Sequence, residues 1–155
     1  MTKATRSTLT LVITLAFLAV AGEAQADESY GIEIRIISAQ PDGAGVDPAL
    51  SRLSADLANL PFKSYKQLDF HARKVRKGET VTMQFPGPGN RFLDVRANGT
   101  RDGKHLFRLG IDALNFKTFV RIPDNGTLIV GGPQHERGVI LLAITARAAR
   151  VAPQR

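Results

Sequence analysis

The chain has no cysteine and no tryptophan among its 155 residues. The lack of cysteine excludes disulfide bonds, thiol redox chemistry, cysteine nucleophiles, cysteine-ligated metals and a lipid-modified N-terminal cysteine. Because no disulfide can staple the fold, a domain built from this chain must be held together by packing alone.

Motifs for catalysis and cofactor binding are also missing. Histidine occurs at three positions, His71, His105 and His135, and each has an arginine or lysine within two residues. Neighbouring positive charge repels a dication, so we expect surface or hydrogen-bonded strand histidines and no metal site. No serine lies in a G-x-S-x-G turn, and no glycine cluster opens a helix as a phosphate-binding loop does. The sequence therefore predicts no catalytic residues, no metal and no cofactor.

The N-terminus has the three parts of a secretory signal peptide. Lys3 and Arg6 form a positive region, residues 9–21 form an apolar run, and Ala24-Gln25-Ala26 provides a small-x-small cleavage pattern. The apolar run of about 13 residues is shorter than the roughly 20 needed to span a bilayer. We predict a signal peptide at residues 1–26 that is cleaved before Asp27.

The remaining residues, 27–155, are expected to form one β-rich domain that works in the periplasm or outside the cell. The whole chain carries a net charge of +7, and removing Lys3, Arg6 and Glu23 lowers it by one. A basic exported domain favours anionic partners such as lipid head groups, acidic glycans or an acidic envelope protein. Export argues against nucleic acid, and the short apolar run leaves no transmembrane span after cleavage.

Alternation of apolar and polar residues predicts a largely antiparallel β fold. Ile32, Ile34 and Ile36 alternate with polar residues, whereas residues 138–146 form an unbroken apolar run typical of a strand buried on both faces. Asn-Gly and Asp-Gly pairs at residues 98, 102 and 125 are typical hairpin turns. The fold class expected is α+β, with a sandwich or barrel-like sheet of about seven to eight strands. The expected strands cover residues 30–39, 64–75, 80–85, 91–97, 104–111, 116–122, 128–130 and 138–146.

One amphipathic helix is expected near the N-terminus of this domain. Asp47 is a suitable N-cap and Pro48 suits the first helical position, while Pro61 ends the helix at or before Leu60. The leucines between these ends recur at spacings of three and four residues, which places them on one face. We predict about three and a half turns packed on a sheet.

The candidate binding site is a basic segment at the end of the second long strand. Arg73, Lys74, Arg76 and Lys77 place four positive charges within five positions, followed by Gly78. Such a segment can be a docking patch for phosphate or carboxylate groups, which arginine binds with two parallel hydrogen bonds. The alternative is a solvated strand edge whose charges prevent sheet-to-sheet aggregation.

Residues 120–145 resemble a segment of the C-terminal domain of bacterial secretins, in which a turn precedes a Thr-Leu-Val-Ile-Gly-Gly strand and a second apolar strand follows. The resemblance implies an envelope setting and β-assembly. The chain lacks the secretin closing segment, so no channel is implied. As a whole it is also similar in style to small exported proteins of Gram-negative bacteria without an assigned activity. The matching residues are Pro123, Asp124, Gly126, Thr127, Leu128, Ile129, Val130, Gly131 and Gly132.

Three functions remain open from the sequence. The first is a non-catalytic exported module that binds an anionic envelope component or a secretion or envelope assembly partner. The second is a hydrolase acting on an envelope polymer through two carboxylates gathered in a cleft. The third is a structural β-protein that assembles with copies of itself through an unpaired strand at residues 138–146. The carboxylates available to the second are Asp69, Asp94, Asp112 and Glu136.

Overall fold

The computed structural model describes residues 28–89 and 91–149. The predicted signal peptide, its cleavage point and the C-terminal end of the chain lie outside the described residues.

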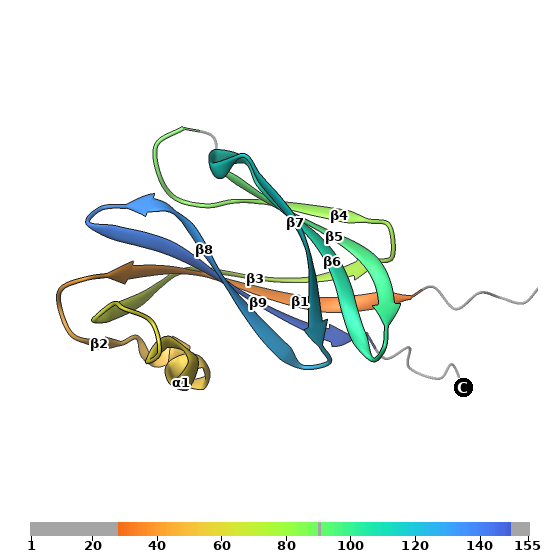
Figure 1. Cartoon of the computed structure of the whole chain (residues 1–155), viewed down its shortest axis with the longest axis horizontal. Coiled ribbons are helices and arrows are strands. Elements are labelled where there is room, and N and C mark those ends of the chain that lie inside the picture. The colour runs from red at the N-terminus through yellow and green to blue at the C-terminus, as the bar shows by residue number, and fades with distance from the viewer. Residues whose placement is uncertain (1–27, 90, 150–155) are drawn as a thin grey trace, which may run out of the picture.

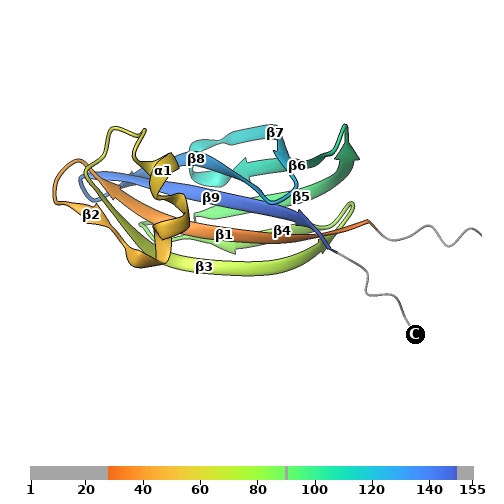
Figure 2. The ribbon, with the colours of Figure 1, turned by 90° about the horizontal axis from the view of Figure 1, so that it is seen from below.

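The described chain forms two β-sheets stacked face to face (Figures 1 and 2). The five-stranded sheet has the order β2-β3-β1-β9-β8, and the four-stranded sheet has the order β4-β5-β6-β7. All pairs are antiparallel except the short β2–β3 contact. The strands are β1 (Ser29–Gln40), β2 (Gly45–Val46), β3 (Ser64–Arg76), β4 (Thr80–Gln84), β5 (Phe92–Arg101), β6 (Lys104–Ile111), β7 (Phe116–Pro123), β8 (Gly126–His135) and β9 (Gly138–Ala148).

The main core lies between the two sheets. Alternate residues of the long strands point into it, so the expected period-2 pattern is confirmed: Ile32, Ile34 and Ile36 of β1 are each 1 % exposed. They pack with residues from the facing sheet, among them Leu93 and Phe107. Because the inner faces are apolar, most charged residues of the strands lie on the two outer faces of the sandwich.

A second apolar cluster lies on the outer face of the five-stranded sheet, where the helical segment covers it. Leu50, Leu53 and Leu57 pack on Ile37 of β1 and Leu141 of β9. Figure 2 shows this segment lying across the sheet on the side away from the other layer. The predicted leucine face is therefore buried against a sheet, as expected.

The length and place of the helix were predicted incorrectly. The structure has a 3₁₀ turn, η1 (Pro48–Leu53), followed by a single α turn, α1 (Ser54–Leu57), and both come after two strands. Asp47 caps the segment by accepting from the amide of Ala49 at 2.9 Å. The last turn tightens because the amide of Leu60 bonds the Leu57 carbonyl at 3.0 Å, an i to i−3 contact.

The strand count and one turn also differ from the prediction. Nine strands are present among the described residues where seven to eight were expected, because the short β2 pairs in parallel with the start of β3. Asn98-Gly99 is not a hairpin turn: it lies within β5, where the register shifts between Ala97 and Gly99. Glycine supplies a φ of 111° there, so the dipeptide serves a β-bulge. A second 3₁₀ turn, η2 (Asp112–Leu114), joins β6 to β7.

The apolar strand β9 is an interior strand of its sheet, between β1 and β8. It pairs with β1 along one edge and with β8 along the other. Its burial on both faces is confirmed, since Ile140, Leu142 and Ile144 are fully buried in the main core and Leu141 lies under the helical segment. Self-assembly through residues 138–146 requires an unpaired strand. The structure contradicts this requirement, because both edges of β9 are paired.

Candidate functional site

The predicted basic segment lies at the end of β3 and in the turn that leads to β4. Beyond its first two residues β3 pairs only with β1, so its other edge is open within the described chain. Side chains alternate across the strand, which separates the four predicted cations. Arg73 shares its face with Val75, a core residue, while Lys74 and Arg76 point to the outer face.

Three of the four predicted residues line one shallow hollow. Lys74, Arg76 and Lys77 surround it together with Glu79. Glu79 accepts a hydrogen bond from the backbone amide of Arg76 at 2.9 Å, which closes the turn. Arg73 lies outside this hollow, and its guanidinium donates to the carbonyl of Ala72 at 3.1 Å. We call Lys74, Arg76 and Lys77 the β3-tip patch.

One member of the β3-tip patch is partly neutralised. The ammonium of Lys77 lies 3.4 Å from a carboxylate oxygen of Glu28. The pKa of Glu28 lies below its ordinary value, first because the Tyr30 hydroxyl donates to that carboxylate and then because Lys77 stands beside it. Lys74 and the Arg76 side chain have no carboxylate partner within the described residues. These two are therefore the cations most available to an anionic ligand.

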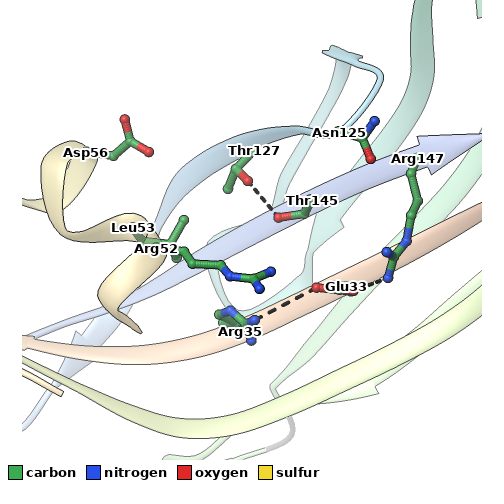
Figure 3. A pocket seen from close by; sticks show the side chains of 9 residues that line it. All are labelled: Glu33, Arg35, Arg52, Leu53, Asp56, Asn125, Thr127, Thr145 and Arg147. Atoms are coloured by element: carbon green, nitrogen blue, oxygen red, sulfur yellow. Dashed lines mark hydrogen bonds and ion pairs between the residues drawn. The ribbon is translucent and has the colours of Figure 1, made fainter. Parts of the chain in front are cut away.

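A second hollow, of about 540 Å³, opens between the helical segment and the outer face of the five-stranded sheet. Figure 3 shows Arg52 reaching across it from the 3₁₀ turn toward the side chains of β1. Glu33 lies on the sheet side and pairs with both Arg35, at 3.8 Å, and Arg147. The hydroxyls of two threonines, Thr127 and Thr145, lie 2.6 Å apart at the rim.

The charges of this second hollow largely cancel. Three arginines, Arg35, Arg52 and Arg147, face two carboxylates, Glu33 and Asp56. Arg35 is further engaged by the ring of Phe70, 4.5 Å from its guanidinium carbon. The hollow is polar and nearly neutral, so it attracts an anion less than the β3-tip patch does.

A third hollow, which the sequence did not single out, lies on the outer face of the four-stranded sheet. Arg96, Arg108 and Lys117 line it, and they come from three different strands. Each basic residue stands at an ordinary polar position of an alternating strand. Only the pairing register brings the three together. The sequence shows that each residue occupies a polar position of its strand, but it does not show that the three are neighbours.

His105 and His71 each lie close to a carboxylate side chain. His105 is 4 % exposed, with Nδ1 3.2 Å from the Thr100 hydroxyl and Nε2 3.0 Å from Asp124, which confirms a hydrogen-bonded strand histidine. His71 Nε2 lies 3.1 Å from Asp69 without forming a hydrogen bond to it. No cluster of three histidine, aspartate or glutamate side chains in the described ranges is arranged to hold a metal.

The carboxylates that a hydrolase would need are dispersed. Asp69 is on β3 and Asp94 on β5, in different sheets, whereas Asp112 begins η2 and Glu136 lies in the turn between β8 and β9. None of the three hollows above is lined by more than one of these four. These four residues therefore do not form the carboxylate pair of a glycosidase at any of the three hollows.

Comparison with known proteins identifies no family for this chain. No protein-family model, no curated protein and no solved structure matches the chain. Within the described ranges, no helix is both long and apolar enough to cross a membrane.

Proposed function

We propose that this protein is a non-catalytic module that binds an anionic component of the cell envelope. The observation that carries the proposal is the β3-tip patch, where Lys74, Arg76 and Lys77 line one hollow opposite a single carboxylate, Glu79. The chain's net charge of +7 supports it, because a positive field attracts anionic surfaces. Export to the envelope is part of the proposal and rests on residues 1–26.

The ligand for this patch is an anionic phospholipid surface. The patch lies on an exposed strand end, next to a turn and an open sheet edge, where a flat surface can approach without a cleft. Each basic residue near an anionic membrane contributes about 1 kcal/mol to binding. The attraction falls with added salt, because the screening length is about 8 Å at physiological ionic strength.

Co-sedimentation with phosphatidylglycerol vesicles tests the proposal. The double variant Lys74→Gln with Arg76→Gln loses two charges, so binding is expected to weaken roughly thirtyfold. The matched control, Lys63→Gln with Lys66→Gln, loses the same charge at exposed positions near the start of β3 and is expected to bind nearly as wild type. An equal loss in both double variants would show a nonspecific charge effect and refute the patch.

The alternatives have less support. The four carboxylates predicted for a hydrolase form no pair at the hollows described, and self-assembly through residues 138–146 would require β9 to give up one of its two pairings. A secretion or envelope assembly partner remains a proposal based on the secretin-like segment. That segment spans the end of β7, all of β8 and most of β9. An acidic face on such a partner would also bind the β3-tip patch.

A further inference from the structure

The outer face of the four-stranded sheet carries exposed cations around an exposed aromatic ring. Because Leu93, Val95, Phe107 and Leu109 point into the core, the residues between them on β5 and β6 point outward. The same alternation on β7 turns Phe119 outward, and Phe119 is 70 % exposed. The outward residues are Asp94, Arg96, Arg108, Gly110, Lys117, Phe119 and Arg121.

Two arginines occupy directly opposed positions on neighbouring strands of this face. Arg96 pairs in register with Arg108, and Arg108 pairs in register with Phe119. Like charges at directly opposed positions destabilise a sheet. Neither arginine forms an ion pair within the described residues. An anion bound between them would relieve this repulsion and satisfy their donors.

The next row of the sheet forms a notch beside the two arginines. Asp94, Gly110 and Lys117 stand side by side across β5, β6 and β7. A Cβ added at Gly110 would be 3.7 Å from the Asp94 side chain, a distance without clash, so glycine leaves open space that a side chain would occupy. The hollow over these rows measures about 190 Å³. Asp94 accepts a hydrogen bond from the Thr82 hydroxyl through one oxygen, which orients the carboxylate.

We infer that this face binds an acidic polysaccharide, with one carboxylate-bearing sugar unit of the polymer in the notch. The sugar carboxylate lies between Arg96 and Arg108, where guanidinium groups bind it through two parallel hydrogen bonds. The apolar face of the sugar ring lies against Phe119. The inference rests on the proposed binding of anionic envelope material, but it uses different residues and a different ligand from the β3-tip patch.

Asp94 distinguishes a sugar from other anions. A carboxylate in the middle of a basic face repels a phosphate surface, yet it is a good acceptor for a hydroxyl group. A sugar carries both the anion and the hydroxyls. An exposed aromatic ring between cations also fits a ligand with an apolar face, whereas a bare polyanion gains nothing from the ring. We call Arg96, Arg108 and Phe119 the sheet-face row.

The test is an NMR titration of the full protein with an oligogalacturonide, a chain of carboxylate-bearing sugars. Amide shifts are expected to concentrate on β5, β6 and β7. The double variant Arg96→Gln with Arg108→Gln is expected to weaken binding at least about tenfold. Phe119→Ala is expected to weaken it about three- to tenfold, with Phe119→Tyr restoring most of the affinity. The charge-matched control Lys63→Gln with Lys66→Gln should change it little.

Three outcomes would overturn the inference. The first is binding of inorganic polyphosphate as tightly as the oligogalacturonide with no effect of Phe119→Ala, which would mean a nonspecific polyanion site. The second is phosphatidylglycerol vesicle binding that depends on the sheet-face row, which would assign this face to membrane. The third is a shift pattern centred on the β3-tip patch. Failure of the vesicle experiment alone would refute the β3-tip patch and leave the sheet-face row standing.

Discussion

At the scale of single residues, Gly138 is the tightest point between β9 and its neighbour. A Cβ added there would lie 1.8 Å from the carbonyl oxygen of Ala39, a backbone atom that cannot turn aside. We expect Gly138→Ala to lower the free energy of unfolding by about 1–3 kcal/mol, because the strands must separate. Gly131→Ala is the control, since nothing lies within 4 Å of its added Cβ. Urea denaturation measures both, and equal stabilities would contradict the close contact.

Tyr65 links a buried hydroxyl to the end of the helical segment. Its hydroxyl donates to the Leu57 carbonyl at 2.8 Å, so Tyr65→Phe is expected to cost about 1 kcal/mol of stability at neutral pH. Burial raises the pKa of Tyr65 above its ordinary 10.0. The tyrosine contribution is therefore complete below pH 10.0 and is lost as pH rises through the folded-state pKa.

Alkaline denaturation tests the direction of this pH dependence of stability. Wild-type protein is expected to lose stability more steeply above pH 10.0 than the Tyr65→Phe variant. Part of the slope should remain, because burial also raises the pKa of Tyr30. Identical slopes for the two proteins would show that Tyr65 titrates as it does in the unfolded chain.

At the scale of elements, the short helical segment depends on packing more than on its own length. A 3₁₀ helix of six residues followed by an α turn of four is too short to be stable alone in water. Leu57 is fully buried in the cluster beneath it, so Leu57→Ala is expected to cost about 2–5 kcal/mol. Ser51→Ala on the exposed side should change stability by less than about 0.5 kcal/mol. Thermal denaturation measures both variants. Equal melting temperatures would contradict the packing of Leu57 on the sheet.

At the scale of the whole molecule, a partly buried chain of polar contacts joins the two sheets. Tyr30 of β1 contacts the Thr100 hydroxyl of β5 at 3.1 Å, Thr100 contacts His105 of β6, and His105 contacts Asp124. We expect His105→Ala to destabilise the fold by about 1–3 kcal/mol, since it removes a buried ring that packs on Tyr30 and forms two hydrogen bonds. His135→Ala is a suitable control, because no hydrogen bond of its ring is formed within the described residues. Calorimetry showing equal melting temperatures would exclude a contribution of this chain to stability.

Much of the strand pattern was predictable because it is local. Alternation marks which residues of a strand face the core, and Asp102-Gly103 and Asn125-Gly126 mark turns whose positive φ only a few residues tolerate. The caps of the helical segment are equally local, and Asp47 was identified correctly. Its length was not, since the choice between an α and a 3₁₀ turn depended on how the leucines met the sheet.

By itself the sequence determined the strand positions, the buried leucine face, the absence of thiol chemistry and the positive charge. The tertiary structure alone decided how the charges are grouped. Arg73 and Lys74 are neighbours in sequence but lie on opposite faces of β3, whereas Arg96 and Arg108 are distant in sequence and directly opposed. The physical reason is that strand order and register arise from contacts between distant segments, and a shift of one residue would turn every side chain to the other face.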